Sequence, residues 1–176
     1  MQRLFRHWLV ILFWLSISFV IVRISNVVAA EKSETPIIVD FASGTVRGVK
    51  VRGLITDIEQ AIGVSRIKKK IEYLEGEPSV VYVILFGNHK IYSHWNAFSY
   101  TDPIFKTKEG LVVGSKVADF NRFYGKGRIA ESEGPGVAIY YRISDKQFCL
   151  ETDHIIGEKR TIEAYSNSKV KEIWVW

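Results

Sequence analysis

The chain has 176 residues, of which 47% are hydrophobic and 24% charged, so it is long enough to bury a core and its composition excludes an intrinsically disordered protein. The formal net charge is +5, but three arginines lie in the first 30 residues, which contain no acid. The remainder has 21 basic against 19 acidic side chains, a net charge of +2. Because basic and aromatic residues are not interleaved either, we expect no nucleic-acid partner.

The first 30 residues have the pattern of a secretory signal peptide. A basic start precedes the apolar run "WLVILFWLSISFVIV", and Val28 and Ala30 occupy positions −3 and −1 of a cleavage site before Glu31. The run has 15 residues, and a spanning helix needs about 20. Cleavage therefore fits better than a retained anchor, which Arg23 after the run leaves open. Either way, we expect residues 31–176 to be secreted or periplasmic.

Two stretches of the chain are similar at an offset of 62 residues. They are "TVRGVKVRGLITDIEQAIGVSRI" at 45–67 and "TKEGLVVGSKVADFNRFYGKGRI" at 107–129, with seven identities in 23 positions. The match favours an internal duplication, and a single sheet without duplication is the alternative. We expect an N-terminal segment with a short strand at 31–44, a first repeat at 45–106, and a second repeat with C-terminal strands at 107–176.

Each copy begins with a pattern typical of a short amphipathic helix. Each helix has one apolar face, an acid in its first turn, where a carboxylate meets the positive end of the helix dipole, and a glycine at its end. These residues are Ile55, Ile58, Ile62, Asp57 and Gly63 in the first copy, and Val117, Phe120, Tyr124, Asp119 and Gly125 in the second. Helices of this length do not persist alone in water, so each must pack on other structure.

Strand patterns follow each helix. In the first copy they are "RIKKKIEYLE", "VVYVILF" and "KIYSHW", and in the second "RIAES", "VAIYYRI" and "QFCLET". A strand at "IIVDF" and closing strands at "TIEAYS" and "KVKEIWVW" complete the series. The sequence therefore predicts an α+β protein with two tandem copies of a short helix plus about three antiparallel strands, and with the helices packed on one face of the sheet.

A helix bracketed by glycines, followed by an antiparallel meander and then repeated, resembles the tandem architecture of the beta-lactamase inhibitor protein. It is also similar to the half-units of small lipoproteins in the outer-membrane barrel-assembly machine. The resemblance covers residues 45–152 and rests on the spacing "G-x-x-V-x-x-x-x-x-D-x-x-x-x-x-G". This chain lacks the inhibitor's disulfides and has no lipobox. The resemblance implies an architecture and no functional residues.

Catalytic and metal-binding patterns are missing from the sequence. His89 and His94 lie five residues apart, which is not a ligand spacing on a helix or a strand, and Cys149 is the single cysteine, in a strand-like run that predicts a buried thiol. We expect a protein that is not an enzyme and has no metal and no cofactor. An unrecognised hydrolase would need His94 or His154 to meet an acid across the fold.

The candidate binding residues are aromatic and lie in two places that the repeat does not explain. The stretch "IYSHWNAFSY" is rich in rings, and "VKEIWVW" places two tryptophans on one strand face. Rigid aromatic side chains give a large contact area at low entropic cost, although rings of this kind also serve as core. The candidate partner-binding residues are Tyr92, His94, Trp95, Phe98, Tyr100, Trp174 and Trp176.

A basic stripe, Arg66, Lys68 and Lys70, is the other distinctive surface feature, and its pattern is typical of a solvated strand face. We expect the chain to be an extracytoplasmic domain that binds another protein. An inhibitor or immunity-type protein that occludes an envelope-targeting enzyme fits best. The alternative is a structural envelope-assembly factor held at the membrane by its N-terminal apolar segment.

Overall fold

The computed structural model describes residues 34–74, 77–94, 96–131, 136–154 and 160–176. The predicted signal peptide and Trp95 lie outside these residues. Residues from Pro36 to Trp176 form one compact unit. Among the described helices, none has the length and apolar character needed to cross a bilayer.

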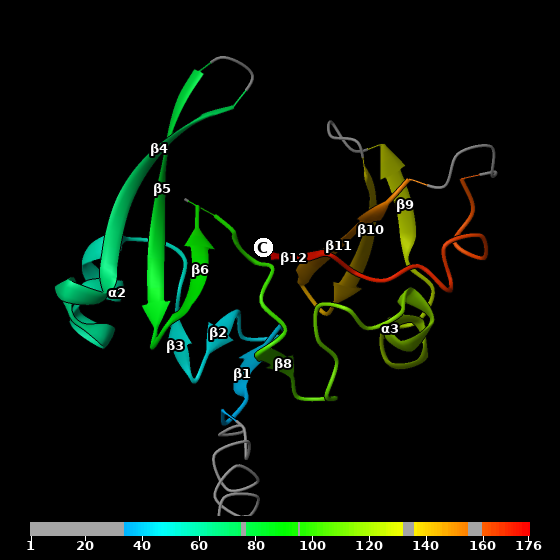
Figure 1. The fold of residues 1–176 in the computed structure, drawn as a ribbon, viewed down its shortest axis with the longest axis horizontal. Coiled ribbons are helices and arrows are strands. Elements are labelled where there is room, and N and C mark those ends of the chain that lie inside the picture. The colour runs from blue at the N-terminus through cyan, green and yellow to red at the C-terminus, as the bar shows by residue number, and fades with distance from the viewer. Residues whose placement is uncertain (1–33, 75–76, 95, 132–135, 155–159) are drawn as a thin grey trace, which may run out of the picture. The chain divides into compact units, whose positions relative to one another are not determined.

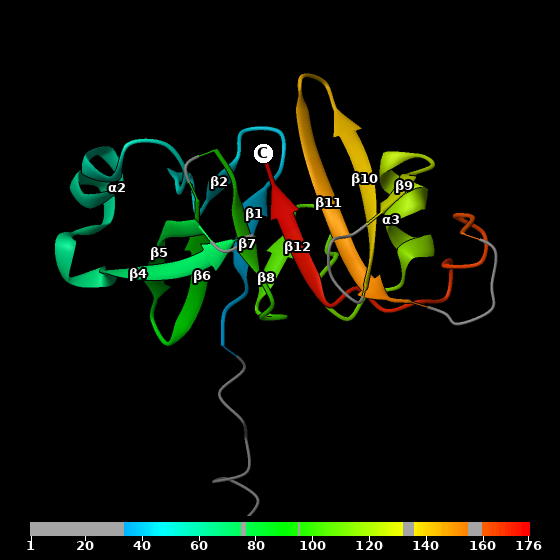
Figure 2. The ribbon, with the colours of Figure 1, turned by 90° about the horizontal axis from the view of Figure 1, so that it is seen from above.

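The larger of two sheets has eight strands in the order β4-β5-β6-β7-β12-β11-β10-β9, and every neighbouring pair is antiparallel (Figures 1 and 2). Its strands are β4 (Ile67–Leu74), β5 (Glu77–Phe86), β6 (His89–Ser93), β7 (Phe98–Tyr100), β9 (Arg128–Glu131), β10 (Gly136–Ile143), β11 (Lys146–Asp153) and β12 (Glu172–Val175). The last strand in sequence, β12, lies inside the sheet between β7 and β11. Consecutive hairpins therefore build each side of the sheet, and β12 joins the two sides.

The smaller sheet has four strands in the order β3-β2-β1-β8. These are β1 (Ile37–Asp40), β2 (Thr45–Val46), β3 (Val49–Lys50) and β8 (Phe105–Thr107). β1 pairs with β8 in parallel, so residues near position 38 contact residues near position 106. This sheet packs against the larger one through aromatic pairs, with the rings of Phe41 and Phe148 4.5 Å apart and those of Tyr100 and Phe105 5.2 Å apart.

Two α-helices, α2 (Ile55–Ile62) and α3 (Val117–Tyr124), lie where the sequence predicts them, and each ends at the expected glycine, Gly63 or Gly125. Both have the predicted acid in the first turn, and the Asp119 carboxylate accepts a hydrogen bond from the Lys116 backbone N–H at 3.3 Å. A 3-10 turn, η1 (Val64–Arg66), leads from α2 into β4. Local periodicity was therefore sufficient to place the helices.

The predicted fold class is wrong. The described part of the chain is mostly β, with an eight-stranded and a four-stranded sheet, and it is not two copies of a helix plus three strands. Residues 45–50, expected to open the first repeat, form β2 and β3 of the second sheet, in which β2 pairs with one edge of β1 and β8 pairs with the other. The helices also differ in surroundings, since α2 packs near β3 and η1 whereas α3 packs near β10. A repeat is not evident in this architecture.

The expected strand at "TIEAYS" is also wrong, since residues 161–168 form successive turns. Ala164, Ser166 and Ser168 each donate their backbone N–H to the carbonyl three residues earlier. This geometry turns Ile162 and Tyr165 toward the same side, and both are buried. Three-residue spacing of apolar side chains fits a turn and does not fit a strand, in which alternate residues share a face.

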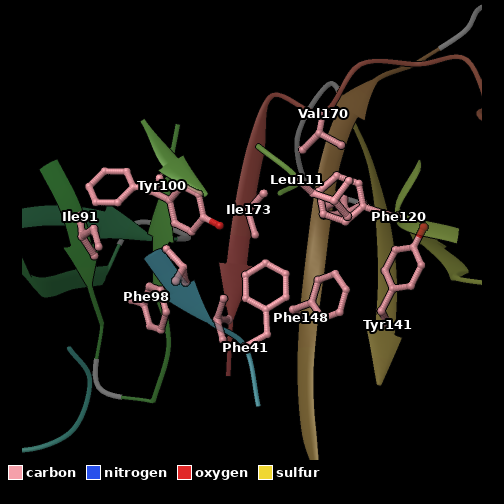
Figure 3. Close-up of a cluster of buried hydrophobic side chains, with 14 of the residues drawn as sticks. Phe41, Ile91, Phe98, Tyr100, Leu111, Phe120, Tyr141, Phe148, Val170 and Ile173 are labelled. Carbon is pink, nitrogen blue, oxygen red and sulfur yellow. The ribbon is translucent and has the colours of Figure 1, made fainter. Parts of the chain in front are cut away.

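The core is formed by buried side chains from the larger sheet, the smaller sheet and both helices, and Figure 3 shows part of this cluster. We call the covered face of the eight-stranded sheet its inner face. Phe148 is at the centre of an aromatic cluster there, with ring centroids 4.9 Å from Tyr124 and 4.9 Å from Tyr141. The helices contribute Ile58 and Phe120, both fully buried. Because these groups fill the inner face, the opposite face is the place to look for a surface that contacts other molecules.

Candidate binding face

The opposite face, which we call the outer face, is defined by the strand registers. Residues directly opposite on neighbouring strands point to the same side of a sheet, and one such row crosses all eight strands. The row consists of Lys68, Val83, Tyr92, Ser99, Trp174, Cys149, Tyr140 and Arg128. No described helix and no strand of the smaller sheet belongs to this face.

Four rings form a continuous contact along the middle of the outer face. The centroids of His94 and Trp174 are 4.8 Å apart, those of Trp174 and Trp176 are 6.1 Å apart, and those of Trp176 and Tyr140 are 6.0 Å apart. All four residues are partly exposed. The rings come from β10, from β12 and from the end of β6, so rigid strands hold them in place. We call these four residues the aromatic row.

Small side chains between the rings are buried. Ser99 lies opposite both Tyr92 and Trp174, and Cys149 lies opposite both Trp174 and Tyr140. Their exposed fractions are 1% and 2%. Burial raises the pKa of the Cys149 thiol to about 12, so it stays protonated and is a poor nucleophile. The predicted buried thiol is confirmed.

Three glutamates accompany the aromatic row. Glu151 and Glu172 face each other across β11 and β12, and Glu72 acts electrostatically on both Glu172 and His94. Glu72 also forms an ion pair on its own strand, with Lys70 Nζ 2.8 Å from Glu72 Oε1. The acidic part of the outer face is therefore centred on Glu151 and Glu172.

The ionisation of these groups follows from partial burial. Burial raises the pKa of Glu151. Burial also raises the pKa of Glu172, and the neighbouring Glu151 adds to this, while contacts from Ser99 and Trp174 oppose it. Burial lowers the pKa of His94, with Glu72 opposing that shift. At neutral pH the face therefore presents a neutral imidazole beside carboxylates that are easier to protonate than ordinary ones.

The Trp174 indole has an unused donor. Its Nε1 atom is buried and makes no hydrogen bond of ordinary geometry with any described residue. The Glu172 carboxylate is close enough for the indole N–H to act as a weak donor, which lowers the pKa of Glu172 slightly. A buried donor without a full partner is costly, so this indole lowers the stability of the fold at the position where it is held.

Basic residues flank the other end of the aromatic row. Beside Tyr140, Lys126, Arg128 and Arg142 line a hollow of about 530 Å³. Lys126 forms an ion pair with Glu163 at 2.5 Å, whereas neither arginine is paired with an acid among the described residues. The outer face is thus acidic around β11 and β12 and basic at the β9 edge, with Lys68 and Lys70 on the same face of β4.

The predicted site residues divide into three groups. Tyr92, His94, Trp174 and Trp176 share the outer face, although Tyr92 has no described ring contact with the row. Phe98 and Tyr100 are fully buried on the inner face, where Figure 3 shows them beside Ile173, and they cannot touch a partner. Trp95 lies outside the described residues. Tyr140 was missed because it sits in an apolar strand with no distinctive composition.

The histidine contacts do not assemble a catalytic site from the candidate residues. His154 Nδ1 is 3.2 Å from the Tyr165 hydroxyl, and the described acid that bonds a histidine is Asp102, whose Oδ2 is 2.6 Å from His89 Nδ1. That pair lies at the start of β6, next to Phe105, away from the aromatic row. In the described part of the chain, no three His, Cys, Asp or Glu side chains gather as metal ligands.

Comparisons with known proteins give little more than the fold. No protein-family model matches the chain, and no curated protein matches it in sequence. Among solved structures, the chain is similar to the crystal structure of the uncharacterized protein yfeY from Escherichia coli, with a TM-score of 0.50 and 14% identity over 80% of this chain and 98% of that one. This likeness concerns the fold alone and does not test the resemblance to the beta-lactamase inhibitor protein.

Proposed function

We propose that the protein is a non-enzymatic extracytoplasmic binding domain, of inhibitor or immunity type, whose outer face occludes the surface of an enzyme in the same compartment. The observation that carries this proposal is the aromatic row of His94, Trp174, Trp176 and Tyr140, held on rigid strands on the face that no described helix covers. Rigid aromatics at the centre of a surface are typical of the residues that dominate binding energy.

The charge pattern indicates the chemistry of the partner. Glu151 and Glu172 lie beside Trp174 on β11 and β12, and Glu72 lies on β4 in an ion pair with Lys70. Arg128 and Arg142 lie at the Tyr140 end of the row. A partner surface of complementary polarity would place basic groups over the glutamates and acidic groups over the arginines. Such complementarity governs the association rate and the choice of partner more than the affinity.

An affinity capture followed by an activity assay tests the proposal. The tagged protein is mixed with envelope and secreted fractions, and the retained proteins are identified by mass spectrometry. We expect one enzyme in stoichiometric amount, with activity that falls as the complex forms. Trp174→Ala should weaken binding by about thirtyfold or more, as for a central aromatic hot spot. Phe123→Ala, which removes an exposed ring from α3, is the matched control and should leave affinity unchanged.

Other outcomes count against the proposal. If the Trp174→Ala and Phe123→Ala variants bind equally well, the outer face is not the interface. Retention of barrel-assembly components would favour the alternative of an envelope-assembly factor. The N-terminus of the purified protein, read by mass spectrometry, bears on the same choice. A start at Glu31 supports a released binding domain, and a start at Met1 supports an anchored factor.

A further inference from the structure

The edge strand β4 is unusually open. It is eight residues long and stands at one end of the eight-stranded sheet, with β5 on one side and no described strand on the other (Figure 1). The exposed fractions of Ile71 and Tyr73 are 57% and 73%. Both are on the inner-face side, as is Val80, which lies opposite Ile71 on β5 and is 41% exposed. This part of the hairpin therefore presents apolar side chains and unpaired backbone groups together.

A long edge with exposed apolar residues is a template for pairing with another strand. Lysines often blunt such edges, and β4 has three in succession, Lys68, Lys69 and Lys70. One acid follows them on the same strand, Glu72, on the face that also carries Lys68 and Lys70. Lys70 and Glu72 form an ion pair within the strand, with Lys70 Nζ 2.8 Å from Glu72 Oε1. An antiparallel copy of β4 would bring a second such pair beside the first, so that each group could also pair with its opposite on the other copy.

We propose that two copies of this chain pair antiparallel through β4, with Ile71 next to Ile71 of the second copy on a twofold axis perpendicular to the sheet. Such an axis keeps the inner faces of both copies on one side and the outer faces on the other. An axis in the plane of the sheet would instead place the apolar side of one β4 beside the charged side of its mate.

Charge selects the register. With Ile71 at the axis, Lys70 of each copy lies opposite Glu72 of the other, which makes two opposite-charge pairs on the outer side. A shift that centres Lys70 also pairs Lys68 with Glu72 twice, but it brings two Lys70 side chains together, and a shift that centres Glu72 brings two carboxylates together. Like charges directly opposite are unfavourable, so the register centred on Ile71 is preferred.

The same register satisfies the inner side. The Ile71 side chains of the two copies contact each other across the axis, next to Val80 of each hairpin. Lys69 of each copy lies opposite Tyr73 of the other, where an ammonium can pack over a phenol ring. The most exposed apolar residues of the hairpin are therefore covered in pairs. Because a single strand pair buries less area than a standard interface, we expect a dimer dissociation constant on the order of micromolar.

Sedimentation velocity measures the dimer dissociation constant directly. The protein is purified with the N-terminus that the cell gives it. We expect a monomer–dimer equilibrium between about 1 and 100 μM. Lys70→Glu should raise the dissociation constant by about tenfold or more, since it places acids opposite acids at two positions. Glu72→Lys should do the same with bases, and the double variant with both changes should restore dimerisation. Lys90→Glu, at an exposed position of the internal strand β6, is the control and should have no effect.

Disulfide cross-linking tests the position of the twofold axis along β4. Strand neighbours have Cα atoms about 4.5–5.5 Å apart, within the reach of a disulfide. Ile71→Cys should therefore give a covalent dimer under mild oxidation. Lys69→Cys should not, because four residues along the strand, about 13 Å, would separate the two thiols. Cys149 is buried and does not compete.

Three results would overturn the proposal: a monomer at about 100 μM, a double variant no more dimeric than either single one, or Lys69→Cys cross-linking as readily as Ile71→Cys. Circular dichroism of each variant confirms that the exposed substitutions leave the fold intact. Partner capture through the outer face is unaffected by these outcomes, since its reporter, Trp174, is on β12.

Discussion

The imidazole of His94 and the indole of Trp174 are in contact on the outer face, with ring centroids 4.8 Å apart and planes inclined by 37°. His94 follows β6 and Trp174 lies on β12, so β7 passes between their strands in the sheet. The contact requires both strands to be in register with β7, where Ser99 faces Trp174 on one side and Tyr92 on the other. It is therefore a sensitive indicator of whether the two sides of the sheet are joined as described.

We expect His94 to titrate below the ordinary histidine value of 6.5, because burial lowers its pKa more than Glu72 raises it. For a base with a lowered folded pKa, the neutral form stabilises the fold above pH 6.5, and this contribution is lost as the pH falls through the folded pKa. The imidazole proton shift in an NMR titration measures the midpoint, and the His94→Gln variant assigns the resonance. A midpoint above 6.5 would contradict the burial of this ring.

Glu172→Gln should stabilise the protein at neutral pH. Burial raises the pKa of Glu172 and the neighbouring Glu151 adds to the shift, so the folded state prefers the protonated form. For an acid with a raised folded pKa, stability is full below the ordinary value and declines as the pH rises through the folded pKa.

Thermal unfolding tests whether Glu172→Gln stabilises the protein. The midpoint of the Glu172→Gln variant should exceed that of the parent by about 1–2 °C at pH 7, with a smaller difference at pH 4. The matched control is Glu163→Gln, because Glu163 is exposed and its pKa is lowered by a hydrogen bond from Lys126. The Glu163→Gln substitution should not stabilise the protein. A lower midpoint for Glu172→Gln at pH 7 would mean that a cation pairs with this carboxylate.

Phe148→Ala should be severely destabilising, by about 3–5 kcal/mol. The ring is 1% exposed and contacts Phe41, Tyr124 and Tyr141 at centroid distances of 4.5 to 4.9 Å, so its removal leaves a cavity that rigid strands cannot close. Chemical denaturation measures the free energy of unfolding. Phe123→Ala removes the same number of atoms from a 51% exposed position and should cost less than about 0.5 kcal/mol. Equal losses in the two variants would contradict this assignment of the core.

Gly127→Ala and Gly63→Ala should destabilise for different reasons. A Cβ at Gly127 would lie 2.6 Å from Ile139 Cγ2 and 2.7 Å from Tyr141 Cζ, so a packed strand would have to shift, at about 1–3 kcal/mol. A Cβ at Gly63 meets nothing within 4 Å, and its cost of about 1–3 kcal/mol comes from the backbone conformation, with φ 86° and ψ 140°.

A second pair of substitutions separates the two causes. Gly63→Asn should lose about as much stability as Gly63→Ala, because the backbone at Gly63, with φ 86° and ψ 140°, is in a region that only glycine adopts readily, and the larger side chain has open space. Gly127→Asn should be worse than Gly127→Ala, because the larger side chain meets the same neighbours. The free energies of unfolding of the four variants give the comparison, and the same rank order at both glycines would show that one mechanism operates at both.

Sequence patterns placed local elements well because their signals are short in range. The helix faces of Ile58 and Phe120 repeat every three or four residues, and glycines with positive φ end both helices. The fold class was missed because it depends on long-range pairing. The partners of β1 are Val46 on one side and Phe105 on the other, and nothing in "IIVDF" identifies them.

The candidate site was predicted in part, and the division has a simple cause. Alternation along "KEIWVW" correctly put Trp174 and Trp176 on one face. The stretch "IYSHWNAFSY" was treated as one aromatic cluster, but it includes the connection between β6 and β7, across which the rings change faces. His94 stays on the outer face, whereas Phe98 points into the core opposite Val175. Composition could not reveal this change of side.

The central position of β12 has a consequence for how the protein is made. A ribosome or a translocation channel delivers the chain from its N-terminus, yet β7 and β11 cannot be bridged until residues 172–175 emerge. Until then both strands present open edges, and the two sides of the sheet remain separate hairpins. A nascent chain of this topology therefore cannot complete the eight-stranded sheet until its last described strand is released, so the joining of the two sides is a late step in its synthesis.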